Sequence, residues 1–359
     1  MNTTNKILII APCLSMGGME RAAVNTANGL AALGNKVIFL SLFKKEHFFL
    51  LETSIEIIEP LRFNENSLNI SKSINWIRNQ TKLHNPNSIL IFSKFYGAIA
   101  ALALFGTKYK FFISERSSPL FKWNLKIKIV NFVAYRLNPP DGVISQTNIA
   151  KQYQQKYFKK KTIIKVIPNT VKMVSLFPNI DREKTILIIG RLGDYLKGFD
   201  RLLEAFALIK NKDWKVVIAG GNENGQYLKD LAVQLGILDR INFLGKVKNI
   251  DLELAKAGIF VIPSRSEGFP NALVEAMAAG VPCISYNFIA GPQDIIEDDV
   301  NGILVPEGDI QGLAYAIDRL ILDPAKRAHL GEKALAVREK YKAATIAKEI
   351  KQFILSDSN

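Results

Sequence analysis

The densest group of residues able to do chemistry lies in the stretch 264–282. The apolar run Ile259–Pro263 before it predicts a strand. A helix is expected to begin near Asn271 and to end at Gly280, because glycine commonly follows the last helical turn. Backbone N–H groups at the start of that helix, at Asn271 and Ala272, have no partner within the helix and suit a phosphate group.

Two carboxylates belong to the same stretch. Glu267 lies in the predicted loop, and Glu275 lies one turn into the predicted helix. Both can accept hydrogen bonds from sugar hydroxyls, which need acceptors more than they need charge. The alternative is a loop acid beside a solvated helical glutamate. The apolar neighbours Val274 and Ala276 weaken that alternative.

A second candidate site follows the predicted strand Thr185–Ile189. The segment 190–198 has glycines at both ends and carries Arg191 and Lys197. Two cations in a glycine-rich loop at the carboxyl end of a strand would neutralise a diphosphate. Loop cations are otherwise simply solvated, so this motif has an ordinary explanation as well.

A third candidate site is the pair Gly17 and Gly18, between a predicted strand, Lys6–Ala11, and the first predicted helix. Two glycines let the backbone approach a ligand closely, with a helix N-terminus behind them. The pair does not match the G-x-G-x-x-G fingerprint of dinucleotide-binding domains. A tight turn alone would also explain it.

The elements that must position these motifs alternate between strand and helix along nearly the whole chain. Such alternation, with strands buried on both faces, predicts doubly wound parallel sheets. The predicted strands are Lys6–Ala11, Lys36–Leu42, Ser88–Phe92, Lys110–Ser114, Gly142–Ser145, Thr162–Ile167, Thr185–Ile189, Lys215–Ala219, Ile241–Leu244, Ile259–Pro263, Pro282–Tyr286 and Gly302–Val305.

A polar stretch, Pro168–Lys184, interrupts the alternation and is interpreted as a linker. We therefore predict an N-terminal Rossmann-like domain over residues 1–168 and a C-terminal one over 169–340. A helical C-terminal segment, 341–359, closes one of the two domains, with a crossing back to the N-terminal domain as one option. Ligands are expected at the carboxyl ends of the strands, in a cleft between the domains.

Charge is divided unevenly along the 359 residues. The net charge of +14 comes from 47 Lys and Arg against 33 Asp and Glu. Residues 1–165 carry 23 basic and 8 acidic side chains, and residues 166–359 carry 24 and 25. A basic half suggests an anionic partner surface, either nucleic acid or membrane.

Several protein classes are excluded by composition. Two cysteines and three histidines are too few for a disulfide framework or a histidine-rich metal site. The N-terminal apolar stretch is too short for a secretory signal, and no apolar run approaches the roughly 18–20 residues that span a bilayer. We therefore expect a soluble protein in the cytoplasm.

The excess positive charge concentrates between residues 108 and 165. The basic residues there are Lys108, Lys110, Arg116, Lys122, Lys126, Lys128, Arg136, Lys151, Lys156, Lys159, Lys160, Lys161 and Lys165. Within Leu120–Leu137, helical spacing places Trp123, Ile127, Val130 and Ala134 on one face, and Phe121, Phe132 and Tyr135 add aromatic rings. Such a helix suits the interface of an anionic membrane. A core-packing helix with a solvated basic face is the alternative.

Taken together, the motifs resemble those of one enzyme family, the retaining glycosyltransferases of family 4, which have the GT-B fold of two Rossmann-like domains facing across a cleft. The resemblance covers essentially the whole chain. Its most specific part is Glu267-Gly-Phe-Pro-Asn-Ala-Leu-Val-Glu275, similar to the E-x7-E element of that family. The other matching segments, in the order of the family, are Val166–Asn169, Ile189–Arg191, Lys197–Phe199, Gly291–Pro292 and Asn301–Gly302.

The resemblance implies that the substrate is a nucleotide-activated sugar. Arg191 and Lys197 would hold its diphosphate, and Glu275 would bind the ribose hydroxyls. The transferred sugar would be bound by Glu267 with the Gly268–Phe269 backbone. The implied donor-binding residues are Gly17, Gly18, Arg191, Lys197, Glu267, Gly268, Phe269, Asn271, Ala272 and Glu275. No metal or other cofactor is expected, because these cations and the helix N-terminus can stabilise a leaving diphosphate, and Asp298-Asp299 is interpreted as a solvated loop.

One departure from the family concerns a histidine that many relatives carry near the reacting sugar. In the corresponding stretch, Ile113–Pro119, Glu115 or Arg116 occupies the place of that histidine. Both residues are candidates for the catalytic set, with Glu267, Arg191 and Lys197.

The Ser114-Glu115-Arg116 segment and Gly291-Pro292 resemble the bacterial branch that extends polyprenyl-diphosphate-linked oligosaccharides, often with N-acetylgalactosamine. This implies a UDP-sugar donor, a lipid-linked glycan acceptor and an anionic membrane surface as partners, without nucleic acid. It places the protein on the cytoplasmic face of the cell membrane. A GT-B nucleotide-sugar epimerase or phosphorylase, and a basic nucleic-acid-binding protein, are the alternatives.

Overall fold

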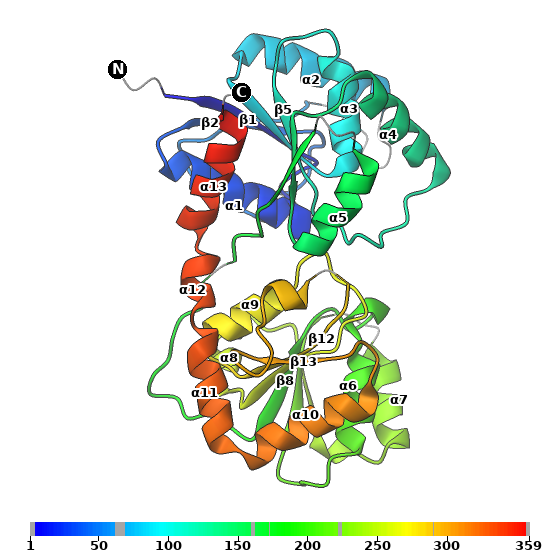
Figure 1. The fold of residues 1–359 in the computed structure, drawn as a ribbon, viewed down its shortest axis with the longest axis vertical. Coiled ribbons are helices and arrows are strands. Elements are labelled where there is room, and N and C mark those ends of the chain that lie inside the picture. Colours follow the sequence, from blue (N-terminus) through cyan, green and yellow to red (C-terminus); the bar gives the residue numbers. More distant parts are fainter. Residues whose placement is uncertain are drawn as a thin grey trace. The chain divides into compact units, whose positions relative to one another are not determined.

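The computed structural model describes residues 4–61, 69–158, 162–171, 173–221, 225–289 and 291–356. These residues form two compact units. Unit 1 comprises Met1–Thr170 with Tyr341–Asn359, and unit 2 comprises Val171–Lys340. The chain passes from one unit to the other at residue 171 and returns at residue 341 (Figure 1).

Within its described residues, unit 1 is built on a seven-stranded parallel sheet in the order β3-β2-β1-β4-β5-β6-β7. The strands are β1 (Lys6–Ala11), β2 (Lys36–Ser41), β3 (Glu56–Ile58), β4 (Ser88–Phe92), β5 (Phe111–Ser114), β6 (Gly142–Ser145) and β7 (Ile163–Val166). Its helices are α1 (Gly18–Ala32), α2 (Ile70–His84), α3 (Lys94–Leu104), α4 (Leu125–Leu137), α5 (Asn148–Tyr157) and α13 (Ala343–Leu355).

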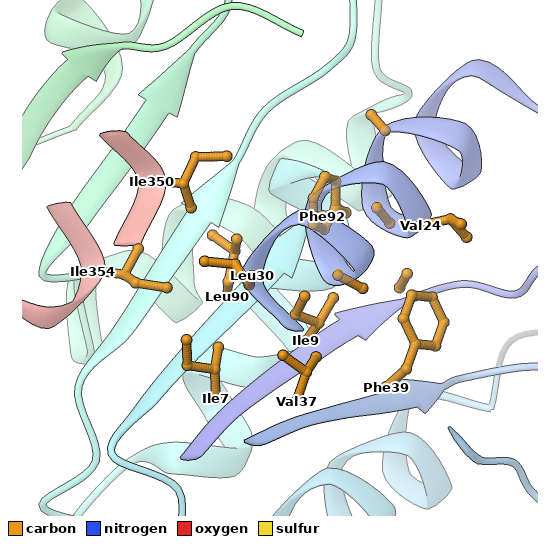
Figure 2. Packing of buried hydrophobic residues seen from close by; sticks show 14 of the residues in the cluster. Ile7, Ile9, Val24, Leu30, Val37, Phe39, Leu90, Phe92, Ile350 and Ile354 are labelled. Atoms are coloured by element: carbon orange, nitrogen blue, oxygen red, sulfur yellow. The ribbon is translucent and has the colours of Figure 1, made fainter. Parts of the chain in front are cut away.

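Helices cover both faces of this sheet, and the central strands β1 and β4 are apolar at every position after the first. Successive side chains of a strand point to opposite faces, so Ile7 and Ile9 join one hydrophobic core while Leu8 and Ile10 join the other. The first core includes residues of α1 and α13, as Figure 2 shows for Leu30. An uninterrupted apolar run is what a parallel strand buried on two faces requires.

The C-terminal helix α13 completes unit 1. Ile350 and Ile354 enter the core with Ile7 and Leu90 (Figure 2). Gly29 of α1 has no room for a side chain, because a Cβ there would lie 2.8 Å from the Cβ of Ala347. The last segment of the chain therefore packs on the first helix.

Unit 2 contains, in its described residues, a six-stranded parallel sheet in the order β10-β9-β8-β11-β12-β13. Its strands are β8 (Thr185–Ile189), β9 (Lys215–Ala219), β10 (Ile241–Gly245), β11 (Ile259–Ile262), β12 (Cys283–Tyr286) and β13 (Ile303–Val305). Its helices are α6 (Phe199–Ala207), α7 (Gln226–Gln234), α8 (Ile250–Lys256), α9 (Asn271–Ala278), α10 (Ile310–Leu322), α11 (Pro324–Ala334) and α12 (Val337–Lys340).

The predicted fold class, with two doubly wound parallel sheets, is confirmed. All twelve predicted strands are present, with ends that agree to within one residue, and β3 is an additional edge strand. In the described part of the chain, no helix combines the length and apolar character needed to cross a membrane.

The predicted amphipathic helix exists as α4, and the apolar face expected from helical spacing turns inward, as in the core-packing alternative. Ala134 and Tyr135 are buried, and Val130 packs against the same core. A second apolar row faces outward and comprises Leu125, Ile129, Phe132 and Val133. Because the helix is apolar on both sides, hydrophobic spacing in the sequence does not show which side is exposed to solvent. The predicted basic residues Lys159, Lys160 and Lys161 lie outside the described residues.

Candidate functional site

Three neighbouring strands of unit 2 end in glycine at the same edge of the sheet. Gly190 follows β8, Gly220 follows β9, and Gly245 ends β10. The N–H of Gly190 donates to Ala219, and the N–H of Gly220 donates to Gly245. A Cβ on Gly220 would overlap the carbonyl of Gly190, so only glycine fits there. This row leaves backbone exposed to a ligand at the carboxyl ends of the strands, where ligands of such sheets bind. The sequence analysis missed Gly220 and Gly245, although their positions directly after apolar runs were a usable signal.

Lys197 and Glu267 meet at this edge. The ammonium of Lys197 lies 2.7 and 2.9 Å from the two carboxylate oxygens of Glu267. Ser264 at the end of β11 donates a hydrogen bond of 2.9 Å to the same carboxylate. Both charged side chains are mostly buried, with 24% and 12% of their surface exposed. The two motifs that were found separately in the sequence therefore form one cluster.

A second ion pair joins the 263–267 loop to the first turn of α6, which directly follows the loop 190–198. Arg265 donates to both carboxylate oxygens of Asp200, at 2.8 and 2.6 Å. Its guanidinium also stacks on the Tyr195 ring, 3.8 Å from the ring centroid, and donates to the Tyr195 carbonyl. Burial alone would raise the pKa of Asp200, but the hydrogen bond and charge of Arg265 outweigh it and hold that pKa below its usual value.

Gly198 lets these loops approach. Its φ of +68° lies in the left-handed region, and a Cβ there would overlap the carbonyl of Pro263. The backbone N–H of Arg265 donates to the Leu196 carbonyl at 2.8 Å. Close backbone packing, side-chain stacking and two ion pairs thus fix the relative position of the loops 190–198 and 263–267.

Helix α9 presents one polar side and one apolar side. Asn271, Ala272 and Glu275 are partly exposed, whereas Leu273 and Val274 are buried. Positions separated by three or four residues lie on the same side of a helix, so Glu275 stands one turn below Asn271 and Ala272. The residue before α9, Pro270, provides no side-chain cap. The Asn271 N–H, which we expected to lack a partner, donates to the Phe269 carbonyl at 2.9 Å, because the loop turns tightly before the helix.

Three further predicted residues of unit 2 differ in their surroundings. Phe269 is buried and anchors the loop, and Gly268 beside it is partly exposed. Arg191 is exposed and pairs with Asp194 at 3.1 Å. Asp194 also accepts a hydrogen bond from the Leu196 N–H, so the loop that carries Arg191 is braced from within.

In unit 1, the Gly17–Gly18 pair begins helix α1. A Cβ on Gly17 would overlap the carboxylate of Glu20, whereas a Cβ on Gly18 would meet nothing within 4 Å. Burial raises the pKa of Glu20, while its own backbone N–H and the charge of Lys45 oppose that shift. Glu20 was not among the predicted site residues, and its partly buried carboxylate makes it a candidate.

Glu115 and Arg116 are both engaged within unit 1. The Glu115 carboxylate accepts hydrogen bonds from the backbone N–H groups of Lys94, at 2.7 Å, and Ser117, at 2.8 Å. Arg116 donates to Ser114 Oγ at 2.7 Å and to Asn169 Oδ1 at 2.6 Å. Burial lowers the pKa of Arg116 to about 10, with Glu115 opposing the shift. Glu115 therefore caps the first turn of α3. Arg116 anchors Asn169, just before the chain leaves unit 1.

Asp298 and Asp299 are bound into unit 2. Asp298 accepts from the Leu304 N–H at 2.8 Å, and Asp299 pairs with Arg319 and Lys326 at 2.9 and 3.0 Å. Among the described residues, no group of three or more His, Cys, Asp or Glu side chains has the arrangement of a metal site.

Comparisons with known proteins agree with this arrangement. Residues 16–173 match the family model described as Glycosyltransferase Family 4, and residues 177–337 match Glycosyl transferases group 1. An uncharacterized glycosyltransferase of Haemophilus influenzae is 30% identical over 94% of this chain and 96% of its own length. A Campylobacter jejuni α-1,4-N-acetyl-D-galactosaminyltransferase, whose name gives its acceptor as GalNAc-α-(1→4)-GalNAc-α-(1→3)-diNAcBac-PP-undecaprenol, is 29% identical over 90% of this chain and 91% of its own length.

Among solved structures, HepE of Anabaena in complex with UDP superposes with a TM-score of 0.81 at 20% identity, over 97% of this chain and 99% of that one. This likeness concerns the fold. The family models cover both units, and the Haemophilus relative spans nearly the whole chain. The protein therefore belongs to glycosyltransferase family 4, has the GT-B fold and is a hexosyltransferase.

Proposed function

We propose that this enzyme transfers a hexose or an N-acetylhexosamine, with N-acetylgalactosamine as the first choice, from a UDP-sugar to a polyprenyl-diphosphate-linked glycan. The transfer retains the configuration at the anomeric carbon and serves the assembly of a bacterial surface glycan or glycoprotein. The name of the Campylobacter relative supports the sugar and the acceptor class, and the UDP complex of HepE supports the nucleotide.

The observation that carries the proposal is the Lys197–Glu267 pair at the carboxyl edge of the unit 2 sheet. A cation beside a carboxylate suits the diphosphate and the sugar of a UDP-sugar. The diphosphate needs positive charge, and the sugar hydroxyls need acceptors. Arg191 adds a second cation on the loop that Lys197 ends. Glu275, one turn into α9, accepts from the ribose hydroxyls, and the backbone N–H of Ala272 in the first turn of α9 faces phosphate oxygen.

In the proposed reaction, the bond between the anomeric carbon and the diphosphate oxygen breaks while the acceptor hydroxyl attacks from the same side. The departing phosphate oxygen takes the proton of that hydroxyl, so no protein base is required. Negative charge grows on the leaving UDP, and Lys197 and Arg191 stabilise it in the transition state. No metal is assigned a role. Glu115 and Arg116 act as positioning residues, because their side chains already hold the start of α3 and Asn169.

The outward face of α4 provides the membrane contact in this proposal. Phe132 is 66% exposed and Leu125 is 72% exposed, and Lys126, Lys128 and Arg136 project from the same helix into solvent. Apolar side chains can enter the headgroup region of a bilayer while cations bind anionic lipid, at about 1 kcal/mol per basic residue near the surface. This contact would keep the enzyme on the cytoplasmic face of the membrane that holds its acceptor.

Two measurements test the proposal. UDP, but not GDP or ADP, should raise the melting temperature of the enzyme, and a lack of stabilisation by UDP would contradict the donor assignment. Mass spectrometry of products from a panel of UDP-sugars and polyprenyl-diphosphate-linked acceptors should show one added sugar, with N-acetylgalactosamine preferred. NMR of that product should show the anomeric configuration of the donor.

A further inference from the structure

Five aromatic rings form a continuous row on unit 1. Neighbouring ring centroids lie 4.8 Å apart for Phe121 and Trp123, 6.1 Å for Trp123 and Phe95, 5.4 Å for Phe95 and Tyr96, and 6.2 Å for Tyr96 and Phe43. All four separations fall in the range of direct ring–ring contact. We call these five residues the aromatic row.

The aromatic row follows the edge of the sheet where ligands of this fold bind. Phe43 comes after β2, Phe95 and Tyr96 open α3 after β4, and Trp123 lies between β5 and α4. The strand order β2-β1-β4-β5 puts the end of β1 between the ends of β2 and β4. The backbone N–H of Phe43 donates to Pro12, just past β1, at 2.8 Å. The row therefore passes the segment that leads from β1 into the Gly17–Gly18 pair.

The rings of the aromatic row are neither core nor free surface. Phe43, Phe95 and Tyr96 are partly buried and pack against the hydrophobic core of unit 1, and Trp123 is partly exposed as well. Phe121 ends the row at 56% exposure. Rings held by the core and by one another, with part of their surface exposed, can stack on a ligand with little reorganisation.

Polar groups gather at the opposite end of the row. The charge of Glu20 acts on Tyr96, and burial, with Glu20 and Cys13 as smaller causes, raises the pKa of Tyr96 to about 12. The Tyr96 hydroxyl thus stays protonated and can donate a hydrogen bond. Ser15 lies 3.0 Å from the Cys13 sulfur in the same segment. A hydroxyl donor, a carboxylate acceptor and a serine hydroxyl stand where the row meets the glycine pair.

We propose that the aromatic row is the binding site for the sugar rings of the acceptor glycan, with Tyr96 and Glu20 holding the hydroxyls of the sugar to be extended. This inference rests on the proposed function, because it assumes a glycan acceptor. A pyranose ring presents an apolar C–H face and a polar rim, which matches stacked aromatic faces with polar groups at one end. A prenyl chain would not bind favourably beside the partly buried carboxylate of Glu20, because it cannot form a hydrogen bond with it. The outward face of α4 offers such a chain an apolar surface instead.

The decisive experiment separates glycan, diphosphate and lipid. The full-length enzyme with ¹⁵N-labelled tryptophan is titrated with a methyl-diphosphate-linked N-acetylgalactosamine trisaccharide, with methyl diphosphate and with farnesyl diphosphate. The trisaccharide should shift the indole N–H signal of Trp123, which Trp123→Phe identifies by its loss, and the other two probes should not. A shift with farnesyl diphosphate alone, or with none of the three, would overturn the proposal.

Kinetics supply an independent check on variants that keep apolar volume. Phe95→Leu and Trp123→Leu should raise the KM for the methyl-diphosphate-linked trisaccharide about tenfold and leave kcat within about twofold. Phe105→Leu, at an exposed aromatic that follows the last turn of α3, at the end opposite Phe95, is the matched control and should leave this KM unchanged. An unchanged KM in both row variants would contradict the proposal. A Trp123 shift in an enzyme that transfers no sugar to this acceptor would refute the proposed acceptor while the glycan site stands.

Discussion

Lys197 contacts both carboxylate oxygens of Glu267, at 2.7 and 2.9 Å, across 70 residues of sequence. The pair places two mostly buried side chains of opposite charge against each other. A UDP-sugar would compete for this cation, because its diphosphate is a stronger partner than a single carboxylate. Donor binding and the rearrangement of this ion pair are therefore expected to be coupled.

Replacing Lys197 should affect UDP binding and turnover differently from replacing Glu267. Lys197→Ala should weaken UDP binding and lower kcat/KM about 10²–10³-fold, the usual loss for one group that stabilises a developing charge. Glu267→Gln should lower kcat but bind UDP at least as tightly as the unaltered enzyme, because Lys197 no longer has to leave a carboxylate. Thermal-shift titration with UDP and initial-rate kinetics measure the two effects, and equal weakening of UDP binding in both variants would contradict the coupling.

The close approach of the two loops at Gly198 can be tested by substitution to alanine. Gly236, which has a similar backbone conformation, is the control position. Gly198 and Gly236 have φ values of +68° and +64°, but only a Cβ at Gly198 would meet other atoms, those of Pro263 and Ser264. Gly236→Ala should cost about 1–2 kcal/mol of stability from backbone strain alone. Gly198→Ala should cost more and should also abolish UDP stabilisation, because the loops must separate. Chemical denaturation and UDP titration check this, and equal losses in the two variants would refute the argument.

The outward face of α4 makes a separate prediction about membrane binding. Ile129→Glu and Phe132→Glu should reduce binding to vesicles containing about 30% anionic lipid by tenfold or more at physiological salt, since each buries a charge in the headgroup region. Leu322→Glu on α10 is the matched control, because Leu322 is 77% exposed on unit 2. Co-sedimentation measures the effect. Binding that ignores lipid charge, or that falls equally in the control, would contradict the assignment of this face.

The strands could be predicted from the sequence because burial on both faces leaves an uninterrupted apolar run. Ile7–Ile10 is such a run, and its side chains divide evenly between the two cores. The strand Glu56–Ile58 escaped prediction because it has three residues, lies at the sheet edge and is half-exposed. An edge strand needs no such run, so composition gave no signal there.

The site was only partly predictable for a different reason. The loop motifs around Lys197 and Glu267 were found from residue types next to strand ends, but their pairing depends on neighbouring strands that lie far apart in sequence. The bond between Arg265 and Asp200 depends on tertiary structure in the same way. Helix α4 is apolar on two sides, so periodicity alone could not decide which side faces solvent.

Glu20 provides a pH test, because burial raises its pKa above the ordinary value of a glutamate. A group with a raised pKa in the folded state stabilises the fold at pH values below its unfolded pKa, and this contribution disappears as the pH rises through the folded pKa. At neutral pH the ionised carboxylate is therefore a net cost. Glu20→Gln should raise the melting temperature at pH 7, and the gain should shrink as the pH falls toward 4.

The same variant should lose function while it gains stability. If Glu20 accepts hydroxyl groups of the acceptor, Glu20→Gln should raise the acceptor KM several-fold, which is the trade-off typical of strained or desolvated groups in active sites. Glu46→Gln, which removes an exposed carboxylate of the same unit, is the matched control and should change neither property. A Glu20→Gln enzyme that is equally destabilised at pH 4 and pH 7 would show that Glu20 serves packing alone. Melting temperatures across this pH range, with acceptor kinetics at pH 7, distinguish the two roles.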